Sequence, residues 1–150
     1  MERERVDQII DRHNSEASSL IQILLDIQSE HNWLPIEALD RVADRLQVPL
    51  TRIWHIATFY KAFSLVPKGR HGVHVCMGTA CHVRGAQRVL DAVEGTTGIK
   101  PGETDLELKY SLETVNCLGC CALGPVVEID GVTHGKMAPA GVADVLKNYD

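Results

Sequence analysis

The sequence predicts an α+β protein, with a helical bundle over residues 1–68 and a small α/β domain over residues 69–150. Apolar residues recur at helical spacing before the short basic turn at residues 67–70. After that turn they alternate in short runs that are typical of strands. All five cysteines lie beyond residue 75. Both the change of pattern and the restriction of the cysteines to the C-terminal half indicate two domains of different character.

Three helices are expected in the N-terminal region. The first has Asn14 or Ser15 as its N-cap and ends at His31-Asn32, where Asn32 suits the left-handed position after a helix. Pro35 and Pro49 suit the first positions of the next two helices. The predicted buried faces consist of Ala17, Leu20, Ile21, Leu24, Leu25 and Gln28, then Ile36, Leu39, Val42, Ala43 and Leu46, and then Ile53, Ile56, Ala57 and Tyr60.

The C-terminal region is expected to follow the order β-α-β-β-β-α. The two strands on either side of Asp130-Gly131 are predicted to form a hairpin, because Asp-Gly is a strong turn signal. A proline, Pro139, opens the last helix. The elements before this last helix are expected at residues 71–76 (strand), 86–94 (helix), 106–115 (strand), 126–129 (strand) and 132–136 (strand).

Composition excludes several classes of function. The chain is 45% hydrophobic and 23% charged, with a net charge of −5, so it lacks the basic surplus of a nucleic-acid binder. No apolar run approaches the roughly 18 residues that a membrane helix needs, and the N-terminus is charged. No G-x-G-x-x-G or Walker loop is present to hold a nucleotide. We expect a cytoplasmic protein without direct membrane insertion.

The cysteines form two clusters, Cys76-x4-Cys81 and Cys117-Leu-Gly-Cys120-Cys121. Their odd number, without a secretory signal, argues against a disulfide framework and favours metal binding. Four thiolates are the ligand set of a 2Fe–2S cluster, but sulfur also suits zinc. A structural zinc ribbon and a thioredoxin-type dithiol at Cys117/Cys120 therefore stay open on spacing alone.

Local features of both loops favour iron. Gly78 and Gly119 let backbone N–H groups approach the sulfurs closely. The first loop also leads into a helix, whose N-terminus favours the negative charge of a thiolate-bound cluster.

At these residues the chain resembles the thioredoxin-like 2Fe–2S subunits of NADH-oxidising complexes. The resemblance covers nearly the whole chain. Three stretches carry it: Cys76-x4-Cys81 followed by His82-Val-Arg-Gly85, then Cys117-Leu-Gly-x-Cys121-Ala-Leu-Gly-Pro125, and, before both, Ala57-Thr-Phe-Tyr60 with Phe63, Pro67 and Gly69. The family includes subunits of respiratory complex I, of NAD-linked and electron-bifurcating hydrogenases, and of formate dehydrogenases. Two positions depart from its common pattern, Tyr110 and Cys120.

The resemblance implies a thioredoxin-like domain with a mixed sheet, a cis-proline at Pro125 and one 2Fe–2S cluster. It assigns the cluster to Cys76, Cys81, Cys117 and Cys121, with Gly78, Thr79 and Gly119 beside the sulfurs, and leaves Cys120 as a packing residue.

The family's function is electron transfer with the flavin of a partner subunit. FMN and NAD are then expected on that NADH-binding flavoprotein, and further iron–sulfur, hydrogenase or formate dehydrogenase subunits are expected as partners. The N-terminal helices are expected to dock on that flavoprotein, and the chain is expected to have no substrate-converting site of its own. A stand-alone thioredoxin-like ferredoxin and a zinc-stabilised interaction module are the alternatives.

Overall fold

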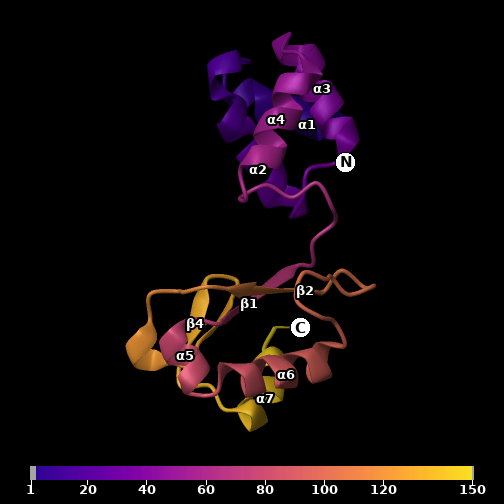
Figure 1. Ribbon diagram of the computed structural model, residues 1–150. Helices are drawn as coiled ribbons and strands as arrows, with labels where there is room; N and C mark the ends of the chain where they lie inside the picture. Colours follow the sequence, from indigo (N-terminus) through magenta and orange to yellow (C-terminus); the bar gives the residue numbers. More distant parts are fainter. Residues whose placement is uncertain (1–2, 150) are drawn as a thin grey trace. The chain divides into compact units, whose positions relative to one another are not determined.

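The structure, a computed structural model, describes residues 3–149 (Figure 1). The chain divides into two compact units, one ending at Pro67 and the other beginning at Lys68. The first unit is helical, and the second combines helices with a sheet, so the predicted α+β class is confirmed. Within the described residues, no helix is both long and apolar enough to cross a membrane.

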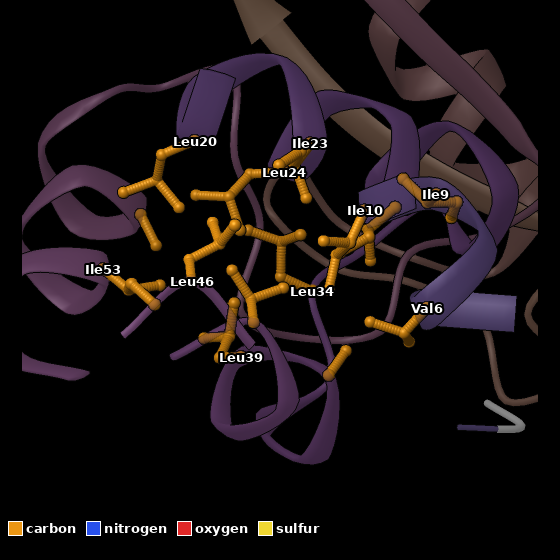
Figure 2. Packing of buried hydrophobic residues seen from close by; sticks show 14 of the residues in the cluster. Val6, Ile9, Ile10, Leu20, Ile23, Leu24, Leu34, Leu39, Leu46 and Ile53 are labelled. Atoms are coloured by element: carbon orange, nitrogen blue, oxygen red, sulfur yellow. The ribbon is translucent and has the colours of Figure 1, made fainter. Parts of the chain in front are cut away.

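The first unit consists of α1 (Arg3–Arg12), a 3-10 turn η1 (Ala17–Ser19), α2 (Leu20–His31), α3 (Ile36–Leu46) and α4 (Leu50–Phe59). Figure 2 shows side chains from all four α-helices meeting in one core. These buried residues include Val6, Ile9, Ile10, Leu20, Ile23, Leu24, Leu34, Leu39, Leu46 and Ile53.

An ion pair joins α1 to α3 beside this core. The Arg41 guanidinium donates two hydrogen bonds to the Asp7 carboxylate, both of 2.8 Å. Arg45 approaches the same carboxylate at 3.2 Å. A two-pronged arginine–carboxylate contact fixes the relative orientation of the two side chains, and so it ties the two helices together.

The start of α2 differs from the prediction. Asn14 and Ser15 do not cap it, because both have left-handed backbone angles (φ 55° and 53°) and follow the end of α1. Asn and Ser suit turns after a helix as well as caps before one, so the residue types alone were ambiguous. Ser19 occupies the N-cap position of α2, and the left-handed Asn32 after its end is confirmed.

The predicted faces of the helices are only partly right. Ile21 and Leu25 are 37% and 43% exposed, because α2 turns Leu20, Ile23, Leu24 and Ile27 inward instead. Apolar residues occupy more than one side of α2, so periodicity did not fix its orientation. Ile36 and Tyr60 are also exposed, and Pro35 and Pro49 stand one residue before their helices.

The second unit contains a four-stranded sheet in the order β2-β1-β3-β4. Its strands are β1 (His71–Cys76), β2 (Tyr110–Val115), β3 (Val127–Ile129) and β4 (Val132–His134). Strand β1 pairs with β2 in parallel and with β3 antiparallel, so the sheet is mixed as predicted. The Asp130-Gly131 hairpin is confirmed, with positive φ at both turn residues.

The helices of this unit are α5 (Thr79–Val83), α6 (Ala86–Thr97) and α7 (Val142–Leu146), with 3-10 turns η2 (Cys121–Leu123) and η3 (Pro139–Gly141). Helices α6 and α7 pack on the same face of the sheet, against Val73, Val75 and Ile129 (Figure 1). Pro139 opens η3, which runs directly into α7.

Strand β2 is shorter than predicted. It begins at Tyr110 rather than at residue 106, because the Asp105 carboxylate accepts hydrogen bonds from the N–H groups of Lys109 and Tyr110 and holds a turn there. Leu106, the first residue of the predicted strand, is fully exposed. The Cys76↔Val115 pairing then brings the ends of β1 and β2 to the same edge of the sheet.

Candidate metal centre

The first cysteine loop joins the end of β1 to the start of α5. Cys76 is the last residue of β1, and Cys81 lies on α5. Both are almost fully buried, at 2% and 1% exposure. Gly78 stands between them at the N-cap of α5, where a β-carbon would lie 2.8 Å from the carbonyl oxygen of Asn116. Only glycine therefore allows the first loop to lie this close to the second.

The second loop follows β2. Because Cys76 pairs with Val115 in parallel strands, this loop begins at the edge of the sheet where the first loop begins. Gly119 takes a left-handed conformation (φ 75°), which favours glycine, and its N–H donates to the Sγ of Cys117 at 3.2 Å. Cys117 and the first residue of η2, Cys121, are both exposed.

Four of the five cysteines come together. Cys76 and Cys81 influence each other's ionisation as close neighbours, and Cys117 does the same to Cys121. All four line one cavity of about 590 Å³. Cys120 does not line it, and its thiol points instead to a backbone carbonyl of its own loop at 3.6 Å. The structure thus separates the half-buried fifth thiol from the other four.

The surroundings of the thiols shift their pKa values in different directions. Burial opposes ionisation of Cys76 and is the largest single influence on it, but its pKa is still lowered. The N–H groups of Gly78 and Leu118 and the Cys81 thiol donate to its sulfur and together outweigh burial. Burial, followed by the bond to the neighbouring thiol, raises the pKa of Cys81. The bond to the other thiol of its pair likewise raises the pKa of Cys121.

The donor set fits a 2Fe–2S cluster. Over residues 3–149, no three His, Cys, Asp or Glu side chains gather as ligands of a single ion. The four cavity thiols lie instead as two pairs, one buried and one exposed. A binuclear cluster with four thiolates uses two of them at each iron. Amide N–H groups already point at Cys76 and Cys117, where they stabilise the negative charge of thiolate sulfur.

The other predicted residues have separate places around the cavity. Gly78 and Thr79 line it, at the start of α5. Gly119 is not part of the lining and acts on the site through its N–H bond to Cys117.

Sequence reasoning assigned no role to Arg84 or Asn116, which also line the cavity. The Nη1 of Arg84 donates to the carbonyl oxygens of Cys121 and Ala122, at 2.9 and 3.3 Å. Arg84 follows Cys81 by three residues, so helical spacing could have placed it on the side of α5 that carries the thiol. Nothing local in the sequence marks Asn116.

The wall behind Cys81 is formed by the segment before β3. The Gly124–Pro125 peptide bond is cis, so this prediction is confirmed. A β-carbon at Gly124 would lie 3.1 Å from the Sγ of Cys81, tighter than an ordinary contact. The next residue but one, Val126, accepts a backbone hydrogen bond from Cys76 at 3.1 Å. This segment therefore closes the buried side of the thiol pair.

Comparison with known proteins gives consistent matches over nearly the whole chain. The family model described as thioredoxin-like [2Fe-2S] ferredoxin matches residues 6–150. The NADP-reducing hydrogenase subunit HndA of Solidesulfovibrio fructosivorans is 36% identical over 96% of this chain and 84% of its own. One subunit of the NADH-quinone oxidoreductase of Escherichia coli K12 is 32% identical over 99% of this chain and 89% of its own.

A solved structure shares the fold. In the air-oxidised NAD+-reducing [NiFe]-hydrogenase, one chain superposes with a TM-score of 0.73 at 20% sequence identity. The match covers 87% of the present chain but only 22% of the hydrogenase chain. The helical unit and the sheet-containing unit therefore both have counterparts within that longer chain.

Proposed function

The chain belongs to the thioredoxin-like [2Fe-2S] ferredoxin family, and from this premise we propose that it is an electron-transfer subunit. We further propose Cys76, Cys81, Cys117 and Cys121 as the ligands of one 2Fe–2S cluster. The observation that carries this proposal is the convergence of these thiols, as two pairs, on one cavity. When bound, such a cluster supplies one-electron transfer without a bond to substrate.

The chain's own residues prepare the cavity for that cluster. Gly78 and Leu118 direct N–H groups at the Cys76 sulfur, and Gly119 does so at Cys117. Such bonds stabilise negative charge on sulfur and thereby help to set a reduction potential. Burial of Cys76 and Cys81 keeps water from one side of the site, whereas Cys117 and Cys121 are exposed. The exposed side is therefore the one that a redox partner can approach.

The names of the relatives support a place in a larger oxidoreductase. We propose that a partner flavoprotein carries FMN and the NAD(H) site, and that the present chain exchanges single electrons with its flavin. A flavin accepts the two electrons of a hydride, and a nearby one-electron centre accepts them singly. On this proposal the chain converts no substrate itself, and further iron–sulfur, hydrogenase or formate dehydrogenase subunits complete the assembly.

We assign the helical unit to docking on that flavoprotein. Its core is built entirely from residues 6–63, whereas the cavity lies in the second unit, so the helices are not needed to enclose the thiols. The end of α4 also presents an uncovered aromatic side chain, since Phe59 is 79% exposed. Exposed aromatic residues are common anchors of protein interfaces.

Metal analysis of anaerobically purified protein tests the cluster. The proposal expects a brown protein with two irons and two inorganic sulfides in each chain, and an optical spectrum typical of a 2Fe–2S centre. A colourless protein with one zinc in each chain would contradict it and support the zinc-stabilised module instead. The NADH-dependent reduction of the brown protein by the flavoprotein then tests the electron transfer.

A further inference from the structure

Arg84 connects the two cysteine loops. It immediately follows α5, the helix that carries Cys81, and its guanidinium reaches across the cavity edge to η2. There the Nη1 donates to the carbonyl oxygens of Cys121 and Ala122, at 2.9 and 3.3 Å. A charged donor makes stronger hydrogen bonds than a neutral one, so this contact fixes the position of the exposed loop relative to the buried thiol pair.

Arg84 is also the charged side chain of the cavity wall. The other lining residues are cysteines or uncharged: Cys76, Gly78, Thr79, Ala80, Cys81, Val83, Asn116, Cys117 and Cys121. Over residues 71–150 acidic side chains outnumber basic ones, so the general charge of the domain does not compensate a negative centre. The positive charge of Arg84 at the cavity wall therefore compensates negative charge in the cavity, which the rest of the domain does not do.

We propose that Arg84 is a positioning residue that holds the Cys121 loop and raises the reduction potential of the bound cluster. This inference rests on the proposed function. Reduction adds one negative charge to the centre, and a fixed guanidinium beside it stabilises the reduced form more than the oxidised form. The same side chain thus combines two effects, a clamp through hydrogen bonds and an electrostatic bias through its charge.

Two substitutions separate these effects in the full-length, cluster-loaded protein. Arg84→Gln removes the charge, whereas Arg84→Lys keeps the charge but loses the planar guanidinium that spans two carbonyls. Arg88→Gln is the matched control, because it removes an equal charge four residues further on, at an exposed position of α6 outside the cavity lining.

The first measurement is the reduction potential, from a redox titration followed by the paramagnetic resonance signal of the reduced cluster. We expect Arg84→Gln to lower the equilibrium constant for reduction about tenfold, which is ~59 mV for one electron. Arg84→Lys is expected to stay near the wild-type potential, as is Arg88→Gln. Equal potentials for Arg84→Gln and Arg88→Gln would overturn the electrostatic role.

The second measurement is amide hydrogen exchange in the second loop, on both loaded and metal-free protein. The N–H groups of Leu123 and Gly124 donate hydrogen bonds to the carbonyl oxygens of Cys120 and Cys121. Their exchange rates therefore report how well ordered the turn η2 is. We expect several-fold faster exchange there in Arg84→Gln and Arg84→Lys, but not in Arg88→Gln. Unchanged exchange would overturn the clamp, even if Arg84→Gln failed to retain a cluster.

These outcomes are distinct from a failure of the proposed function. If wild-type protein binds zinc instead of iron and sulfide, the proposed function is wrong. If the wild type carries the cluster but Arg84 variants match the Arg88 control in both measurements, only the role of Arg84 is wrong.

Discussion

Gly78 and Asn116 lie so close together that a β-carbon on the glycine would stand 2.8 Å from the asparagine's carbonyl oxygen. Real β-carbons essentially never come this near to another atom. The contact joins loops that are far apart in the sequence, because each follows one of two parallel strands that end at the same edge of the sheet. The approach of the two thiol-bearing loops thus depends on a missing side chain.

We therefore predict that Gly78→Ala displaces the loops and loses most of the bound iron. The obstructing atom belongs to backbone and cannot rotate away, so we expect a cost of about 1–3 kcal/mol as for an overpacked core. Iron and sulfide analysis, with the visible absorption of the purified variant, measures the loss.

Gly95→Ala is the control for this substitution. Gly95 lies inside α6 with open space around its Cα and an ordinary backbone conformation. Replacing a helical glycine by alanine is expected to stabilise the domain by about 0.5–1 kcal/mol, seen as a higher apparent midpoint of thermal unfolding. Full iron content in Gly78→Ala, equal to that of Gly95→Ala, would show that the close contact is not needed.

Cysteine substitutions test which four thiols bind the cluster. We predict that Cys120→Ala retains iron, sulfide and the visible spectrum, because Cys120 lies outside the cavity lining and packs as a small apolar side chain. Cys76→Ala should lose the cluster, since Cys76 is almost fully buried and its thiol lines the cavity together with those of Cys81, Cys117 and Cys121. Loss of the visible absorption in Cys120→Ala would disprove the proposed ligand set.

Local patterns identified most of the elements, but orientation required tertiary contacts. Strand β1 occurs at residues 71–76 as predicted, because the buried Val73 and Val75 alternate with the less buried Gly72 and His74. The buried side of α2 was partly mispredicted, because its apolar residues occupy more than one side of the helix and only its packing against α1 and the shared core decides between them. Likewise, Asn14 and Ser15 end one helix rather than start the next.

The candidate site also has features that local sequence patterns predict and features that only tertiary contacts create. Short spacing within each loop made the two cysteine clusters visible in the sequence. The approach of Gly78 to Asn116 and the reach of Arg84 to η2 depend on the parallel pairing of β1 with β2. A pairing between distant segments leaves no local pattern in a single sequence, so neither contact was predictable from it.

The Asp7–Arg41 pair predicts a pH-dependent stability of the helical unit. Hydrogen bonding by Arg41 is the main cause that holds the pKa of Asp7 below its ordinary value. A lowered folded-state pKa stabilises the fold above the unfolded-state pKa of about 3.9, and this contribution is lost as pH falls through the folded-state value. Because both side chains are partly exposed, we expect Asp7→Asn to cost about 1 kcal/mol at pH 7.

Tryptophan fluorescence measures this effect in the helical unit alone. Both tryptophans of the sequence, Trp33 and Trp54, belong to that unit. The difference in the free energy of urea unfolding between wild type and Asp7→Asn should shrink toward zero as the pH falls below about 4. Asp144→Asn, which breaks an exposed pair in the other unit, should leave the fluorescence transition unchanged. A constant difference at all pH values would exclude the ion pair as its cause.

A chain that starts at Lys68 is predicted to bind a cluster but not the flavoprotein. Residues 73–146 supply both apolar clusters of the second unit, and the four cavity cysteines also lie there, so this unit has its own core. Its visible spectrum and iron content should equal those of the full chain. Binding is measured by co-purification with the FMN- and NADH-binding subunit of the same complex. Undiminished binding of the shortened chain would refute the docking role of the helices.

A point substitution in the full chain separates docking from folding. Phe59 is 79% exposed and its ring makes an edge contact with the neighbouring Tyr60, so Phe59→Ala removes little from the helical core. If Phe59 anchors the flavoprotein, this variant should bind at least about tenfold more weakly, or roughly 1.4 kcal/mol. Val132→Ala, at an exposed apolar side chain of the other unit, is the matched control. Equal affinities of the two variants would locate the docking surface away from the end of α4.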